Sequence, residues 1–576
     1  MRNAEIASHF DELASLYELD GASSYRVVAY RTAAKNIRDS GASVAEMARQ
    51  GNAESLPGIG KAIADKIGAL LEQGTIPSAD KLKERIPPGL VEVTRIPGLG
   101  PKRVKVLHDH LGIGSLEELK EAAAAGGLDD VPGVGPKARD NVLAALEKGP
   151  EAPRLLLDQA LSVGNEIVEG LRDEPATLRA ELAGSARRLA DTVKDLDIVV
   201  AASEPGAVTK AFTKLPALES VNVAGEAGAK GLTHHGLPVD LRIVPEESFG
   251  NLLQHFTGSG RHNEALRTAA VRKGLHVSEY GVQDDESGTT HAFADEKEVY
   301  ALLGMSWIDP ELREDRGELE RARDRSLPQL LQQSDLKGDL HCHTTASDGR
   351  NSILEMGRAA LERGYEYLAI TDHSASHGFG NDVQPDELLR QVERIAEANE
   401  QLEGITLLAG TEVNVLTDGA LDYADDVLER LDWIVASLHT SFRMKEEEMT
   451  ARMVAAMEHP LVDVIGHPTG RLIGRREPYA LDVDRVVEVA ARTGTFLEIN
   501  ANPNRRDLPD TLARGAAEAG VTLTVDSDAH GVDTLHKIWF GVATARRAWL
   551  TPEQVANTRS WPELDRLRKR DSSASS

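Results

Sequence analysis

Hydrophobic and polar positions follow two patterns along this chain. The first twenty residues, MRNAEIASHFDELASLYELD, mix charged and apolar residues as an amphipathic helix does. From residue 335 onward, short apolar runs alternate with segments rich in Ala, Glu and Arg, such as ILEMGRAALERG (353–364). The apolar runs predict strands and the segments between them predict helices, so we expect parallel β/α units in this part of the chain.

Residues that bind metals end most of these apolar runs. In LHCH (340–343) two histidines stand two positions apart, and in a strand such positions face the same side, so His341 and His343 converge while Cys342 points away. Functional side chains at the carboxyl ends of parallel strands are typical of an α/β barrel. Later runs end at His373, Glu412, His439, His467, and Asp528 with His530, whereas TFLEIN (495–500) ends at Asn500 and lacks a ligand.

These segments resemble the polymerase and histidinol phosphatase (PHP) family. Its motifs appear here as HCH with Asp348, TDH, the Glu412 and SLH segments, and DSDAH. The resemblance implies a distorted TIM-like barrel whose site holds up to three divalent ions (Mn²⁺, Zn²⁺ or Fe²⁺), bridged by Glu412, for the hydrolysis of phosphate esters. The implied ligands are His341, His343, Asp348, His373, Glu412, His439, His467, Asp528 and His530.

The N-terminal part repeats a different motif three times. The segments LPGIGKAIADKI (56–67), IPGLGPKRVKVL (96–107) and VPGVGPKARDNV (131–142) place Pro-Gly-apolar-Gly before an amphipathic helix. A single copy is as well explained by a Gly-Pro connector between helices. Three copies resemble the helix-hairpin-helix motif, in which the bare N–H groups at a helix start hold a DNA phosphate. The expected DNA contacts are Gly58, Gly60, Lys61, Gly98, Gly100, Lys102, Gly133, Gly135 and Lys137.

Three aspartates mark the central part of the chain. Asp195 and Asp197 share one face of the predicted strand in KDLDIVV, and Asp240 lies in a second predicted strand, LPVDLRIV. Three carboxylates on adjacent strands can hold two divalent ions, Mg²⁺ or Mn²⁺, which activate a 3′-hydroxyl and neutralise a leaving pyrophosphate. A triphosphate cradle is expected from Gly184, Ser185, Arg187 and Arg188.

Residues 1–320 resemble, in collinear order, the family X DNA polymerases related to DNA polymerase beta. The resemblance implies that Asp195, Asp197 and Asp240 are catalytic, and it places the nucleotide-binding residues at Gly184, Ser185, Arg188, His255, Phe256, Gly258, Asn263 and Arg267. His255 replaces a tyrosine of polymerase beta, and this replacement weakens the case for a stacking and sugar-gate role at this position. Lys66 matches the Schiff-base lysine of the lyase domain, which attacks abasic sites, although Thr32 replaces a lysine that helps to bind the 5′-phosphate there.

The composition and charge of the chain limit the kinds of protein that it can be. The chain has 576 residues, 41% of them hydrophobic, one cysteine, and no apolar run long enough to span a membrane, so we expect a cytoplasmic multidomain protein. The net charge of −28 argues against a protein that coats nucleic acid, but the segment 81–150 is nearly neutral, which leaves room for a local DNA contact. Because coiled-coil repeats are absent from the sequence, we expect a monomer.

The predicted fold combines all-α helix-hairpin-helix domains, an α+β palm and thumb, and an α/β PHP barrel. The expected boundaries are 1–80 (lyase-like), 81–150 (DNA-binding fingers), 151–245 (nucleotidyltransferase palm), 246–320 (thumb), 321–334 (linker) and 335–570 (PHP domain).

The predicted function is a DNA polymerase that fills short gaps in base excision repair. Its substrates would be gapped or primer-template DNA and deoxynucleoside triphosphates, and its PHP domain would act on DNA ends as a 3′-5′ exonuclease, a 3′-phosphatase or an abasic-site phosphoesterase. Two alternatives remain at this level: a small-molecule phosphatase fused to a DNA-binding module, and a non-catalytic DNA-binding scaffold.

Overall fold

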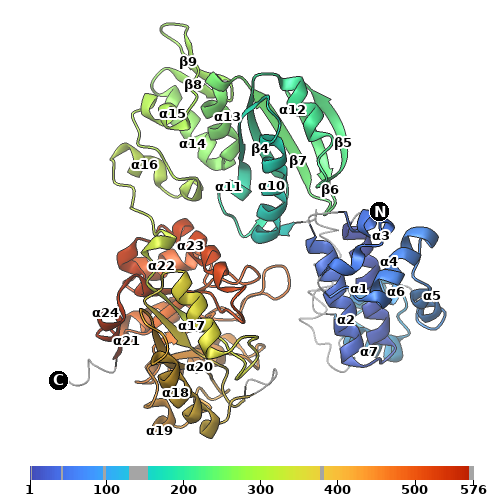
Figure 1. Cartoon of the computed structure of the whole chain (residues 1–576), viewed down its shortest axis with the longest axis vertical. Helices are drawn as coiled ribbons and strands as arrows, with labels where there is room; N and C mark the ends of the chain where they lie inside the picture. The colour runs from blue at the N-terminus through green and yellow to red at the C-terminus, as the bar shows by residue number, and fades with distance from the viewer. Residues whose placement is uncertain are drawn as a thin grey trace.

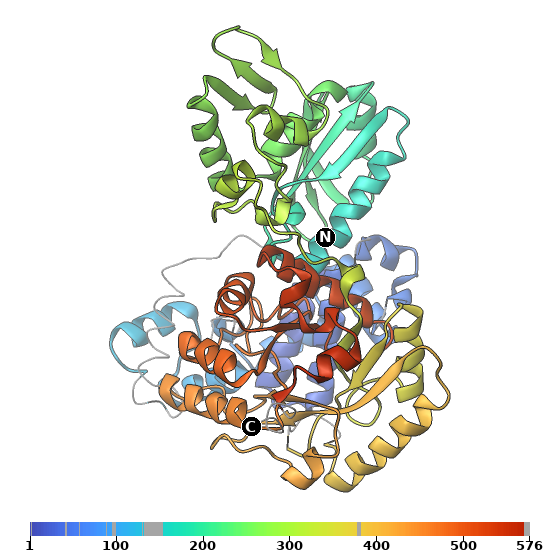
Figure 2. The same cartoon turned by 90° about the vertical axis from the view of Figure 1, so that its left-hand side faces the viewer.

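A computed structural model describes residues 1, 3–40, 43–56, 58–87, 89–94, 99–128, 131, 154–376 and 382–569. The third helix-hairpin-helix segment lies outside these residues apart from Val131, and so does Gly98 of the second segment. Figures 1 and 2 show an N-terminal body made of helices, a mixed α/β part, and a C-terminal barrel surrounded by helices.

The N-terminal helices enclose one hydrophobic core that runs from Ile6 to Val131. Side-chain oxygens start two of the helices, because Ser43 accepts from Glu46 N at 3.3 Å and Ser115 from Glu118 N at 3.2 Å. The predicted division at residue 80 falls inside helix α5 and does not coincide with a break in the core. The helices are α1 (Asn3–Leu19), α2 (Ser24–Asp39), α3 (Val44–Arg49), α4 (Lys61–Gln73), α5 (Pro77–Lys83), α6 (Gly89–Thr94), α7 (Pro101–Leu111) and α8 (Leu116–Ala124).

The palm is a five-stranded sheet in the order β2-β4-β7-β6-β5, in which only β4 and β7 run parallel. Alternate residues of β4 face opposite cores: Ile198 and Val200 pack with α10 and α12, and Val199 and Ala201 pack with α13. The elements are β1 (Leu155–Leu156), α10 (Leu157–Arg172), β2 (Thr177–Leu182), α11 (Gly184–Arg187), β3 (Thr192–Val193), β4 (Leu196–Ala202), α12 (Pro205–Phe212), β5 (Leu218–Gly225), β6 (Gly228–Thr233) and β7 (Pro238–Val244).

The thumb packs helices against a three-stranded antiparallel sheet. Its core continues through Leu319, Ala322 and Leu330, so the predicted linker 321–334 is partly built into the thumb. The elements are α13 (Phe249–Thr257), α14 (Gly260–Val271), β8 (Leu275–Ser278), β9 (Gly281–Asp284), β10 (Thr290–His291), α15 (Glu296–Leu302) and α16 (Glu318–Arg323).

The C-terminal domain is a nearly closed barrel of seven parallel strands in sequential order. The first and last strands meet where His343 N donates to Ala529 O at 2.8 Å. Its strands are β11 (Gly338–Cys342), β12 (Tyr367–Ile370), β13 (Thr406–Asn414), β14 (Trp433–Ser437), β15 (Val464–Ile465), β16 (Phe496–Asn500) and β17 (Leu523–Asp526). Its helices are α17 (Ile353–Glu362), α18 (Pro385–Asn399), α19 (Asp425–Leu428), α20 (Glu446–Glu458), α21 (Val483–Thr493), α22 (Asp510–Glu518), α23 (Ile538–Arg547) and α24 (Trp561–Asp565).

Barrel helix α23 joins the barrel to the palm and the thumb. Phe540, with Trp539 beside it, packs into the palm core, and Trp549, just beyond the helix, packs into the thumb core. In Figure 1 this helix lies at the side of the barrel that faces the palm and thumb. None of the described helices is long and apolar enough to cross a membrane.

Candidate active sites

Glu412 lies at the centre of the histidines that end the barrel strands. Its Oε2 is 2.7 Å from His373 Nδ1 and 3.4 Å from His341 Nε2. Its Oε1 is 3.1 Å from His439 Nε2 and 3.0 Å from His467 Nε2. Burial opposes ionisation of Glu412, but these histidines outweigh it and hold the pKa of the carboxyl well below its usual range.

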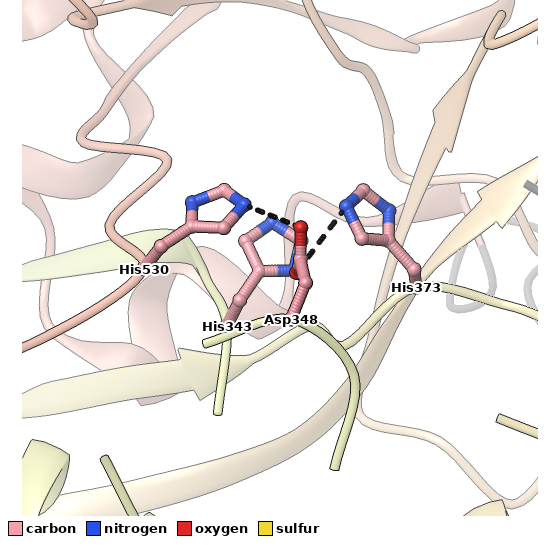
Figure 3. Close-up of side chains that lie close together, drawn as sticks. All are labelled: His343, Asp348, His373 and His530. Carbon is pink, nitrogen blue, oxygen red and sulfur yellow. Dashed lines mark ion pairs between the residues drawn. The ribbon is translucent and has the colours of Figure 1, made fainter. Parts of the chain in front are cut away.

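A second carboxylate, Asp348, gathers three more ring nitrogens at the mouth of the site. Figure 3 shows Asp348 among the rings of His530, His373 and His343. Asp348 Oδ2 is 3.2 Å from His530 Nε2, and its Oδ1 is 3.7 Å from His373 Nε2. Asp528 completes the set, because its Oδ1 lies 3.2 Å from His343 Nε2.

These residues fit a cluster of divalent ions. Three overlapping groups have ligand atoms within 4.8 Å of one another: His343-Asp348-His373-His530, His341-His343-Asp528 and His373-Glu412-His439. His341 Nε2 and both ring nitrogens of His343 are buried and make no well-formed hydrogen bond, although carboxylate oxygens lie 3.2–3.9 Å from them. Such an arrangement is costly for polar atoms unless a shared cation satisfies them. Imidazole and carboxylate ligands suit Mn²⁺, Zn²⁺ or Fe²⁺.

A pocket of about 270 Å³ opens over this cluster. Besides the ligands, Phe442, Arg476 and Arg505 line it. The Arg476 guanidinium lies 4.2 Å from the centre of the Phe442 ring, and its Nε donates to Gly470 O at 2.7 Å. Two arginines therefore stand beside the candidate ions, in positions suited to an anionic substrate.

The palm aspartates meet on two neighbouring strands. Asp197 of β4 is paired in register with Asp240 of the parallel strand β7. Asp195 precedes β4, and its side chain is 39% exposed. Burial, followed by repulsion from Asp195 and Asp240, raises the pKa of Asp197 to about 7. Three like charges crowded in this way are stabilised by bound cations.

A glycine brings the phosphate cradle against this site. Gly184 has a φ of 60°, and a Cβ at this position would meet Asp197 Oδ2 at 2.2 Å. The short helix α11 begins at Gly184, and Ser185 is its second residue. Arg188 follows the helix and donates from Nη1 to Thr257 O at 2.6 Å. The predicted cradle residues are therefore next to Asp197 in space.

The remaining predicted nucleotide-binding residues surround the end of α13. Gly258 packs close to Arg188, because a Cβ on Gly258 would lie 3.1 Å from Arg188 Nη1. Both atoms of the Asn263 side-chain amide make hydrogen bonds within the thumb. Nδ2 donates to His255 O at 2.7 Å, and Oδ1 accepts from Gln254 Nε2 at 2.9 Å. Arg267 is exposed on α14. The Arg242 guanidinium lies over the Phe256 ring, 5.4 Å from its centre.

Comparison with known proteins decides the family. Family models match the chain as Helix-hairpin-helix domain (1–76), SAM-like Helix-hairpin-helix tandem (90–148), DNA polymerase beta thumb (252–314) and PHP domain (339–502). The DNA polymerase/3′-5′ exonuclease PolX of Bacillus subtilis (strain 168) is 38% identical over 574 residues, which cover 99% of this chain and 100% of that protein. The chain belongs to the PolX family. The predicted resemblance and the predicted fold class are confirmed.

Two further relatives of this PolX chain carry the name "Probable phosphatase". The one from Caldanaerobacter subterraneus subsp. tengcongensis is 34% identical over 203 residues, which cover 33% of this chain and 75% of that protein. The one from Thermoanaerobacter sp. (strain X514) is 31% identical over 239 residues, which cover 38% of this chain and 89% of that protein. These two relatives match 33% and 38% of the chain, whereas the PolX relative from Bacillus subtilis matches 99% of it and so spans both catalytic parts.

Two residues of the PolX barrel site, Glu498 and Asn500, were not predicted from the sequence. Strand β16 contributes Glu498, whose Oε1 lies 2.6 Å from His341 Nδ1 and whose Oε2 accepts from His467 N at 2.5 Å. Asn500, at the end of the same strand, donates to Asp528 Oδ2 at 3.1 Å. TFLEIN therefore carries groups that orient the ligands. The signal that could have indicated this role is a lone carboxylate within an otherwise apolar strand.

The structure also places some of the predicted DNA contacts of this PolX chain. Gly60 is the N-cap of α4, Lys61 is exposed as its first residue, and Gly100 is the N-cap of α7. Gly58 has a φ of 73° and packs against α2, where a Cβ would meet Asn36 Nδ2 at 2.9 Å. The contacts predicted at Gly98, Gly133, Gly135 and Lys137 lie outside the described residues.

Proposed function

We propose that this PolX protein fills short gaps during DNA repair and trims 3′ ends with its barrel. The observation that carries the proposal is that one chain holds both an in-register Asp197-Asp240 pair beside Gly184 and a barrel rim of histidines and carboxylates. The full-length likeness to a DNA polymerase/3′-5′ exonuclease supports it.

In the palm, Asp195, Asp197 and Asp240 would hold Mg²⁺ or Mn²⁺. Such ions supply the charge that lowers the pKa of a primer 3′-hydroxyl and neutralises the departing pyrophosphate. Arg188 and Ser185 would hold the triphosphate through charge-assisted hydrogen bonds. Burial and the neighbouring carboxylates raise the pKa of Asp197 to about 7, so bound cations would favour its ionised form, which is the form that acts as a ligand.

In the barrel, His341, His343, Asp348, His373, Glu412, His439, His467, Asp528 and His530 would hold up to three divalent ions. Ions in such a cluster activate water for attack on phosphorus and act as Lewis acids toward the phosphate oxygens. Arg476 and Arg505 would orient the phosphate at the pocket wall, where Phe442 fixes the Arg476 guanidinium in place. Exonuclease action is the main proposal, and 3′-phosphatase and abasic-site activity use the same chemistry.

A lyase function for Lys66 is a secondary part of the proposal. Lys66 is half-buried on α4, its Nζ donates to Ala62 O at 3.2 Å, and it lies 5.8 Å from the ring centre of Tyr30. An amine in this position would attack the aldehyde of an abasic site. Gapped DNA and deoxynucleoside triphosphates are the proposed substrates, and a monomer in the cytoplasm is the proposed state.

A small-molecule phosphatase is the competing function, because two relatives are named probable phosphatases. The DNA-end proposal is favoured by the helix-hairpin-helix matches at 1–76 and 90–148, which a small-molecule enzyme does not need. Release of phosphate from histidinol phosphate, without any action on DNA ends, would support the competitor. A scaffold with a silent palm is opposed by the three intact aspartates.

The experiment uses a labelled primer in a short-gapped duplex with a 5′-phosphate, in Mn²⁺, with and without nucleotides. Wild type is expected to lengthen the primer with nucleotides and to shorten it without them. Asp195→Ala should abolish only the lengthening, and His343→Ala should abolish only the shortening. A protein that only shortens the primer would make the palm a binding platform, and a protein that does neither would direct attention to small phosphomonoesters.

A further inference from the structure

Three arginines of the barrel bind the segment 188–191, which follows the palm helix α11. Arg547, at the end of α23, donates from Nη1 to Arg188 O at 2.6 Å. Arg506, in the loop after β16, donates from Nη1 to Leu189 O at 3.0 Å and pairs with Asp191 at 3.1 Å. Arg471 pairs with Asp191 at 2.9 Å. Two consecutive carbonyls and one carboxylate of the palm are thus bound by the other catalytic domain.

The same contact region includes the side chain of Arg188. Glu314 of the thumb uses one oxygen, Oε1, to accept from Arg188 Nε at 3.1 Å and from Arg547 Nη1 at 3.0 Å. Arg188 Nη1 is fixed separately by Thr257 O at 2.6 Å. Arg188 is therefore oriented by the thumb and the barrel together, because Thr257 and Glu314 belong to the thumb and Arg547 contacts both the Arg188 carbonyl and its carboxylate partner.

The two arginines that bind the palm backbone are buried, and each of them has a carboxylate partner. The side chain of Arg506 is 0% exposed and that of Arg547 is 9% exposed. Arg506 also donates from Nε to Thr544 Oγ1 at 2.9 Å, and Arg547 Nη2 pairs with Asp510 at 3.0 Å. Buried ion pairs seldom stabilise a fold more than apolar residues would, whereas they do fix one geometry. Arg506 binds the carbonyl of Leu189, a residue with a φ of 56°. This contact fixes the backbone directly after the nucleotide-binding residue Arg188.

We propose that Arg547 and Arg506 are positioning residues for nucleotidyl transfer, so that the PHP barrel is a working part of the polymerase site. They act through Arg188: by holding its carbonyl and sharing Glu314 with it, the barrel keeps the guanidinium where a triphosphate arrives. When the triphosphate binds Arg188, Glu314 retains Arg547 as its counter-charge. This inference rests on the proposed function, because it takes Arg188 as a triphosphate contact.

The neighbouring Arg546 supplies a matched control. It belongs to the same helix and also joins the barrel to the thumb side, because its guanidinium pairs with Asp309 at 3.1 Å and with Glu311 at 2.7 Å. It also donates to Leu331 O at 3.2 Å, but none of these partners belongs to the segment 188–191. Loss of Arg546 removes interdomain ion pairs of the same kind without touching the backbone of Arg188.

The test measures KM for a nucleotide, kcat and exonuclease rate in full-length Arg547→Met, Arg547→Lys, Arg546→Met and Arg188→Met. Arg547→Met is expected to raise KM at least about tenfold, as expected for the loss of a charge-assisted hydrogen bond, with a smaller change in kcat and an unchanged exonuclease rate. Arg547→Lys should recover part of the KM, because an ammonium still reaches Glu314. Arg546→Met should keep the KM of wild type.

The outcomes distinguish a failure of the positioning role from a failure of the proposed function. If Arg188→Met raises KM but Arg547→Met behaves like Arg546→Met, the positioning role is overturned and the proposed function stands. If Arg188→Met leaves KM unchanged, the triphosphate role of Arg188 fails, and the inference fails with it. The exonuclease rate of Arg547→Met reports whether the variant is folded, and Arg547→Lys provides the same comparison with less disturbance of the fold.

Discussion

His341 Nδ1 and Glu498 Oε1 lie 2.6 Å apart in the wall of the barrel. With Nδ1 engaged by the carboxylate, the other ring nitrogen of His341 is the one that faces the ligand cluster. A partner of this kind fixes both the tautomer and the orientation of a metal-binding histidine. The residue that prepares the ligand is thus on a different strand from the ligand itself.

Glu498→Gln is therefore expected to weaken metal binding at the barrel by about 10- to 100-fold, the usual effect of losing such a partner. Metal content by elemental analysis and exonuclease rate against Mn²⁺ concentration would show it. Primer extension by the same variant serves as the control and should match wild type. A variant with full metal content and normal exonuclease activity would remove Glu498 from the account.

The clustering of the candidate barrel ligands was largely predictable, whereas the residues that support them were not. Ligands such as His373 and His467 follow apolar runs, so the strand pattern alone places them together at one rim. Glu498 lies inside its strand, and its role depends on a neighbour more than 150 positions away in sequence, which periodicity cannot reveal. The same holds for Arg506 and Arg547, whose partners in the palm depend on how two domains pack.

Gly184→Ala is expected to reduce polymerase activity by about 100-fold or more. The added Cβ would meet Asp197 Oδ2 at 2.2 Å, and misplacing a catalytic group by about 1 Å has costs of this order. The measurement is single-nucleotide insertion into gapped DNA. Gly206→Ala on α12 is the matched control, because a Cβ there meets nothing within 4 Å. Normal insertion by Gly184→Ala would show that Asp197 does not need this close approach.

Glu296 joins the palm to the thumb, and its loss should destabilise both. The buried carboxylate pairs with Arg187 at 2.8 Å and with Arg313 at 3.0 Å. Glu296→Gln leaves the buried guanidinium of Arg313 and the half-buried guanidinium of Arg187 without their counter-charge, so we expect about 3–5 kcal/mol of lost stability. Thermal and urea unfolding would measure it, and Glu298→Gln on the same helix is the control. An equal stability of the two variants would contradict the prediction.

The stability that Glu296 contributes through its two arginine partners depends on pH with a definite sign. Burial opposes ionisation, but Arg313 and Arg187 lower the pKa of Glu296 from an ordinary 4.5 to about 2. A carboxyl group whose pKa falls on folding stabilises the folded state above the unfolded value, and this contribution is lost as pH falls from about 4.5 toward 2. The stability difference between wild type and Glu296→Gln should therefore shrink over that range. A difference that stays constant would exclude this linkage.

Lys61 is expected to contact a DNA phosphate at the start of α4. Lys61→Ala should reduce the slope of log affinity against log salt by about 0.9, the contribution of one neutralised phosphate. Fluorescence anisotropy with a gapped duplex at several salt concentrations measures the slope. Lys120→Ala on α8, which is exposed but not at a Pro-Gly turn, should leave it unchanged. Equal slopes for all three proteins would argue against the helix-hairpin-helix contact.

The most direct test of the central claim asks whether one domain prepares the end that the other extends. A labelled primer ending in a dideoxynucleotide, annealed across a short gap, is incubated with Mn²⁺ and nucleotides. Wild type should remove the blocked residue and then extend the primer, His343→Ala should leave it intact, Asp195→Ala should only shorten it, and a mixture of the two variants should restore extension. Shortening without extension by wild type, or extension of the blocked primer by His343→Ala, would contradict the account.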